Sequence, residues 1–149
     1  MTETTTATEA LSYQSQVQFS KPPDVVFDAL TSLTGLAGWW SPVTGSGAAS
    51  GELRFTHRHV DPLVISVDTA DRPRSVAWTV LAYSLQPEWV GTHITFMLRP
   101  SQSGGTRLEF RHTGLTPQLE CYDHCSRGWD LFLPSLRDYV ETGTGSPLG

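Results

Sequence analysis

An alternating segment directly before a long one-faced helix constrains this chain most. Residues 106–112 read Thr-Arg-Leu-Glu-Phe-Arg-His. The two-residue period of a strand places Leu108, Phe110 and His112 on one face and the charged residues on the other. Since the charged face meets water, the opposite face is buried or lines a cavity. A histidine that continues an apolar row is the kind of polar group that a binding cavity uses.

The segment that follows predicts a helix. Thr116-Pro117 supplies a cap and a proline for its start, the helix runs to about Thr142, and Gly143 is its C-terminal stop. Its apolar residues recur at helical spacing and form one stripe: Leu119, Tyr122, Trp129, Leu133, Leu136 and Val140. Pro134 lies inside the helix and should kink it, because proline removes one backbone hydrogen bond. We expect the helix to lie across the sheet and to bound a ligand cavity.

The rest of the chain predicts further strands and two short helices. Strands are expected at residues 13–19, 52–60, 63–70, 75–82 and 92–99, with turns at 61–62, 71–73 and 104–105 and a flexible loop at 45–51. The first helix begins after Pro22-Pro23, with Val26, Phe27 and Leu30 buried. The second helix covers residues 33–40. Sequential strands without helical crossovers form an antiparallel meander. The predicted fold is therefore α+β: a curved antiparallel sheet of about six strands wrapped around a long C-terminal helix, with two short helices after strand one.

Length and charge limit the class of protein. The 149 residues predict one domain over 11–142, between a disordered tail at 1–10 and a flexible tail at 143–149. A net charge of −5 argues against a nucleic-acid partner, because phosphate binding needs a basic face. No apolar run approaches the roughly 20 residues of a membrane span. The N-terminus also lacks the features of a signal peptide, so a cytoplasmic location without a membrane partner is predicted.

Two cysteines are spaced by four residues in the predicted helix. Cys121 and Cys125 would share a helical face, but a disulfide fits that spacing poorly. Asp123 and His124 point away from that face, so this segment is not read as a metal site. Buried, reduced thiols are the favoured interpretation, in keeping with a cytosolic protein, and a reactive thiol is the alternative.

Several sequence segments, in this order, resemble the START-like (SRPBCC) helix-grip superfamily. They are residues 23–30, Trp39-Trp40-Ser41-Pro42, 51–55, 89–98, 105–115 and Gly128-Trp129. More narrowly, the chain resembles homologues of the C-terminal domain of the heat-shock-protein ATPase activator. The resemblance implies a helix-grip fold with a hydrophobic cavity between the sheet and the last helix. It implies no single activity, because the superfamily includes lipid carriers, hormone receptors, cyclases, resistance proteins and co-chaperone domains.

The inward faces of these elements supply candidate ligand-binding residues. They are Trp40, Phe55, His57, His59, Trp78, Phe96, Phe110, His112 and Trp129. The aromatic rings would form walls and the histidines would orient a hydrophobic or aromatic small molecule. A metal or other cofactor is not expected, because no carboxylate or cysteine partners the histidines at a diagnostic spacing. The competing interpretation is that these side chains simply fill the core.

Two alternatives stay open beside simple ligand binding. One is a cyclase- or hydrolase-like enzyme with His112 as general acid or base, although no nucleophile motif supports it. The other is a co-chaperone-like interaction module. Full activation of a chaperone ATPase is not expected, because only about ten residues precede the first strand and the acidic chain offers no basic docking face. A second copy of the chain, in a homodimer, is a possible partner.

Overall fold

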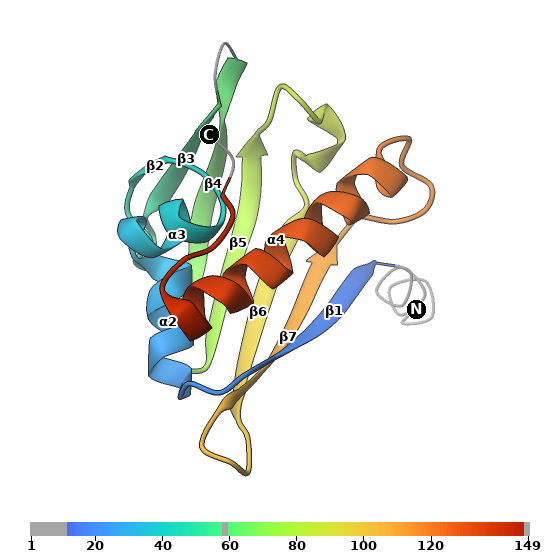
Figure 1. The fold of residues 1–149 in the computed structure, drawn as a ribbon. Coiled ribbons are helices and arrows are strands. Elements are labelled where there is room, and N and C mark those ends of the chain that lie inside the picture. Colours follow the sequence, from blue (N-terminus) through green and yellow to red (C-terminus); the bar gives the residue numbers. More distant parts are fainter. Residues whose placement is uncertain (1–11, 58–59, 148–149) are drawn as a thin grey trace.

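In the computed structural model, which describes residues 12–57 and 60–147, one antiparallel sheet wraps around a long helix (Figure 1). The elements in chain order are β1 (Tyr13–Phe19), α2 (Pro23–Thr31), α3 (Leu33–Trp39), β2 (Val43–Gly45), β3 (Glu52–His57), β4 (Val60–Asp71), β5 (Ser75–Ala82), the 3-10 turn η1 (Pro87–Trp89), β6 (His93–Pro100), β7 (Thr106–Thr113) and α4 (Tyr122–Thr142). In this part of the chain, seven strands are ordered β1-β7-β6-β5-β4-β3-β2. The predicted α+β helix-grip fold is confirmed, with one more strand than expected.

Helix α4 crosses one face of the sheet, while α2 and α3 pack beside it at the β2–β4 side (Figure 1). The helical layer is joined by buried hydrogen bonds: the Trp39 indole donates to the Ala29 carbonyl at 2.8 Å, and the Ser135 hydroxyl donates to the Trp39 carbonyl at 2.9 Å. The core lies between this layer and the sheet. Trp129, Leu133, Leu136 and Val140 of the predicted α4 stripe are all buried there.

Two local predictions in the N-terminal half need correction. The turn predicted at Asp61-Pro62 is wrong, because β3 ends at His57, β4 already begins at Val60, and both residues belong to β4. Pro62 is tolerated there because the register shifts between Phe55 and His57, where the ladder of hydrogen bonds is irregular. Strand β2 was missed because it is only three residues long and leads into a glycine-rich segment.

The start of α4 was also predicted wrongly. Residues 117–121 form turns, and the helix begins at Tyr122 rather than at the Thr116-Pro117 pair, so Leu119 lies outside the helix. The carboxylate of Glu88, from η1, accepts the backbone N–H groups of Cys121 at 3.1 Å and Glu120 at 3.3 Å. A residue distant in sequence therefore caps this helix.

The predicted end of α4 is confirmed. Gly143 has φ 88°, a left-handed conformation that glycine adopts without strain, and its N–H donates to the Tyr139 carbonyl at 2.8 Å. The helix continues through Pro134. Beyond it, the Ser146 N–H donates to the Ser135 hydroxyl at 2.7 Å, so the described part of the C-terminal tail contacts α4. The predicted tail at 1–10 lies outside the described residues.

Candidate ligand-binding site

The predicted aromatic site residues lie together in the core. Trp40, Phe55, Trp78, Phe96, Phe110, His112 and Trp129 are all buried. Their rings contact one another: Trp40 lies 4.3 Å from Phe55 and 5.2 Å from Trp129, and Phe110 lies 4.5 Å from Trp129, measured between ring centroids. These rings pack against each other between the sheet and α4. Of this group, only Trp129 also lines the pocket described below.

The other two predicted histidines cannot be placed in this cluster. His57 is the last residue of β3, and its side chain is not among those the structure describes. His59 lies outside the described residues altogether. A ligand-orienting role for either residue stays a prediction.

His112 sits at the end of the aromatic cluster with no exposed surface and both ring nitrogens in use. The Trp129 indole N–H, which can only donate, lies 3.0 Å from Nδ1, so Nδ1 must accept and the neutral ring carries its proton on Nε2. Nε2 lies 2.8 Å from the Thr92 hydroxyl, which itself donates to the Trp89 carbonyl at 2.6 Å. Every polar atom in this chain of contacts therefore has a partner.

This environment fixes the charge state of His112. Burial, with a smaller contribution from His93, lowers the pKa of His112 from 6.5 to about 3, so the ring is neutral near physiological pH. The Nδ1 lone pair is occupied by Trp129, and the Nε2 proton is committed to Thr92. These contacts favour a structural role in which His112 joins β7 to α4 and to the η1 segment.

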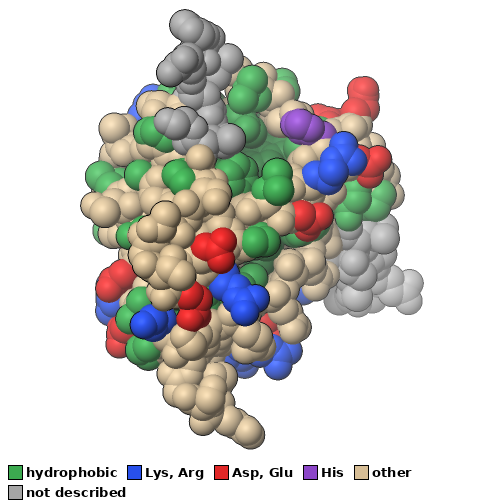
Figure 2. Space-filling view, viewed as in Figure 1, with side chains coloured by type: hydrophobic (Ala, Val, Ile, Leu, Met, Phe, Trp, Pro, Cys, Tyr) green, Lys and Arg blue, Asp and Glu red, His purple; other side chains and the backbone are tan. Residues whose placement is uncertain are grey.

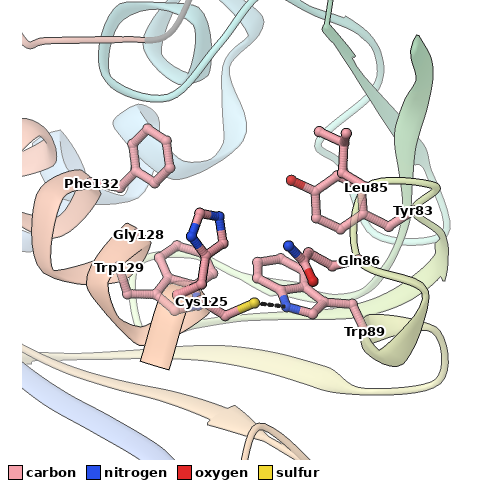
Figure 3. Close-up of a pocket in the computed structure, with 9 residues that line it drawn as sticks. Tyr83, Leu85, Gln86, Trp89, Cys125, Gly128, Trp129 and Phe132 are labelled. Carbon is pink, nitrogen blue, oxygen red and sulfur yellow. Dashed lines mark hydrogen bonds between the residues drawn. The ribbon is translucent and has the colours of Figure 1, made fainter. Parts of the chain in front are cut away.

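A small pocket opens beside this cluster, between the chain that follows β5 and the first half of α4 (Figure 3). Its volume is about 190 Å³. In Figure 2, hydrophobic side chains gather around a hollow on the same face of the molecule. The lining residues are Tyr83, Leu85, Gln86, Trp89, His124, Cys125, Gly128, Trp129 and Phe132.

The pocket combines aromatic walls with a few polar groups. Trp89 and Trp129 stack at 5.8 Å with an interplanar angle of 11°, and Tyr83 meets Trp89 edge to face at 5.0 Å. The Trp89 indole donates to the Cys125 sulfur at 3.1 Å, as Figure 3 shows. Burial raises the pKa of Tyr83 to about 12, so its hydroxyl stays protonated. The arrangement suits a planar apolar molecule that carries one or two polar groups.

Of these lining residues, only Trp129 was predicted from the sequence. The lining residues of α4 could have been predicted, because Cys125, Trp129 and Phe132 recur at helical spacing on one face. The lining residues between Tyr83 and Trp89 could not, since that segment follows neither a strand nor a helix period. Tertiary packing brings that segment to α4.

Among residues 12–57 and 60–147, no group of three or more histidine, cysteine or acidic side chains is placed to hold a metal ion. Within the same residues, no helix has the length and apolarity needed to cross a membrane.

A curved antiparallel sheet that grips a long C-terminal helix defines the START-like helix-grip class. The family model for activator of Hsp90 ATPase homolog 1-like proteins matches residues 20–141, and the chain belongs to that family. No curated protein matches the sequence significantly.

Solved structures share the fold over most of the chain. The Aha1 dimer from Colwellia psychrerythraea is 26% identical, with a TM-score of 0.78 over 90% of this chain and 98% of that one. Protein MLL2253 from Mesorhizobium loti is 21% identical, with a TM-score of 0.75 over 87% and 96% of the two chains. DynU16, from the dynemicin biosynthetic locus, is 20% identical, with a TM-score of 0.71 over 91% of this chain and 49% of its own.

Proposed function

We propose that this protein binds a compact, planar aromatic molecule in the pocket between Tyr83–Trp89 and α4. The observation that carries the proposal is the pair of stacked indoles, Trp89 and Trp129, which forms an apolar wall open to that pocket. Gln86, His124 and the Tyr83 hydroxyl lie around the wall and would orient polar groups of the ligand.

The size of the pocket narrows the ligand class. A volume of about 190 Å³ is below the roughly 300–1,000 Å³ of pockets for drug-sized ligands, so a ligand of one or two rings fits best. A long acyl chain would need space that the packed rings of Trp40, Phe55 and Phe110 occupy. The free thiol of Cys125 at the pocket fits an intracellular setting, where thiols stay reduced.

Gly128 offers a direct test. It lines the pocket, and a Cβ built on it meets no atom within 4 Å. Gly128→Leu should therefore fill the pocket without displacing the core, while Gly128→Ala leaves most of it open. The wild type and Gly128→Ala should bind indole and 1-naphthol, whereas Gly128→Leu should bind neither. Calorimetry and tryptophan fluorescence measure the binding.

Palmitic acid is the matched comparison for a lipid ligand. Equal binding of indole by the wild type and by Gly128→Leu would place the ligand elsewhere and contradict the proposal. Binding of palmitic acid in preference to both aromatic probes would contradict the ligand class.

A co-chaperone-like interaction is the second candidate, favoured by the family and by the likeness to a dimeric Aha1. On this proposal the chain also forms a homodimer. Light scattering would give the oligomeric state, and the mass of a complex formed with purified Hsp90 would test the interaction. Given the net charge of −5, we expect the interaction to leave the Hsp90 ATPase rate unstimulated.

A further inference from the structure

Two cysteines at the start of α4 form a close pair. Cys121 immediately precedes the helix in a helical conformation, with φ −81° and ψ −1°, and the Cys125 N–H donates to the Cys121 carbonyl at 2.7 Å. The residues are thus one helical turn apart. Both are free, and only 8% of Cys121 and 4% of Cys125 is exposed. Burial, followed by the hydrogen bond that the Cys121 thiol donates to Cys125, raises the pKa of Cys121 to about 12.

Both sulfur-bearing side chains can be approached from the surface. Cys125 lines the aromatic pocket, and Cys121 lines a neighbouring depression beside Glu88. Gln86 and His124 line both hollows, which therefore adjoin, and each hollow reaches one cysteine of the pair.

The spacing of the pair favours a bridge longer than a disulfide. Residues four apart on a helix have Cβ atoms about 5–6 Å apart, whereas a disulfide needs about 3.5–4.5 Å. One atom inserted between the sulfurs lengthens the bridge enough to span the helical distance. The helix therefore resists oxidation of the pair to a disulfide yet presents two sulfurs to a single bridging atom.

We propose that Cys121 and Cys125 form a binding site for a trivalent organic arsenical, whose arsenic atom bridges the two sulfurs. The arsenic of an aryl arsenical makes one of its three bonds to carbon, so two thiols supply the other two. A structural zinc ion would need four ligands, and no cluster of three or more suitable side chains exists among the described residues. The aryl group would lie against Trp89, whose indole donates to the Cys125 sulfur at 3.1 Å.

The chemistry balances without a redox partner. An aryl arsenoxide condenses with the two thiols: two As–S bonds form, the As–O bonding is lost, and the two thiol protons leave with the oxygen as water. Arsenic stays trivalent and no electrons are transferred. Because the thiols lose their protons only on binding, the high pKa of Cys121 slows the reaction without preventing it.

Phenylarsine oxide, added to the reduced full-length chain in excess glutathione, tests the proposal by native mass spectrometry. The wild type should retain one phenylarsenic group. Cys121→Ser and Cys125→Ser should each retain it at least about 100-fold less tightly, because a single thiol lacks the chelate advantage. Binding should also change the tryptophan fluorescence through Trp89.

The matched control keeps two thiols but moves one of them. Cys125→Ser combined with Ser126→Cys places the sulfurs five residues apart, on different faces of α4. Retention by this variant equal to that of the wild type, or no adduct on the wild type, would overturn the proposal. Circular dichroism checks folding, and if one single variant fails to fold the other carries the test. The aromatic-ligand proposal stands or falls separately, because its test does not involve these thiols.

Discussion

The two ends of the interface between the sheet and α4 differ in how fully side chains fill them. At the end covered by α3, Trp40 contacts the rings of Trp39, Phe55 and Trp78, with centroids 4.3–6.0 Å apart. At the other end, the short segment of η1 covers the sheet, and a pocket of about 190 Å³ remains. The helical layer, rather than the sheet, therefore decides where the fold is solid and where it is open.

Stability should fall most when a buried aromatic side chain is truncated at the end covered by α3. Phe55→Ala should destabilise the protein by about 3–5 kcal/mol, because Phe55 is fully buried and its loss leaves a cavity beside the rings of Trp40 and Trp78. Phe132→Ala, at the pocket, should cost about 1 kcal/mol, since the half-buried ring already faces a hollow. Urea denaturation measures both. Equal losses would mean that the two ends are packed alike.

His112, at the boundary between the two ends, should make the stability of the protein depend on pH. His112 has a folded pKa of about 3 and an ordinary value of 6.5, so between these values the unfolded chain binds a proton that the folded chain does not. Its contribution to stability is therefore intact above about pH 6.5 and falls as the pH drops toward 3. The loss between pH 6 and pH 4 should be about 2.5 kcal/mol.

Denaturation curves at several pH values should show this loss in the wild type and in His124→Gln, which changes an exposed histidine of the pocket. In His112→Gln the acid-dependent slope should be smaller by the same amount, even though the variant is less stable overall. A slope unchanged by His112→Gln would contradict the neutral, buried state of this ring.

The smallest effect is expected at the edge of the open end. Glu88 is exposed but caps α4 through the backbone N–H groups of Cys121 and Glu120. Glu88→Ala should lower the free energy of unfolding by about 1 kcal/mol and fray the first turn of α4. Hydrogen exchange of the first α4 amides measures the fraying, and Glu120→Ala is the control. Equal protection in both variants would show that the cap is unimportant.

Much of the fold could be predicted because its signals are local. The alternation over 106–112 placed Leu108, Phe110 and His112 on one buried face, and the structure confirms all three. Gly143 marked the end of α4 for a similar reason, since only a few consecutive residues decide a left-handed stop. The start of α4 was missed because Glu88, more than thirty residues away, supplies the cap.

Local patterns suffice to predict the helix-grip fold, since strand and helix periods are properties of neighbouring residues. The same periods place His112 on an apolar face. The role of His112 depends on long-range contacts, because Thr92 and Trp129, which occupy its two nitrogens, come from other parts of the chain. The pocket also depends on long-range contacts. Tyr83 and Leu85 reach α4 through tertiary packing, which no local period predicts.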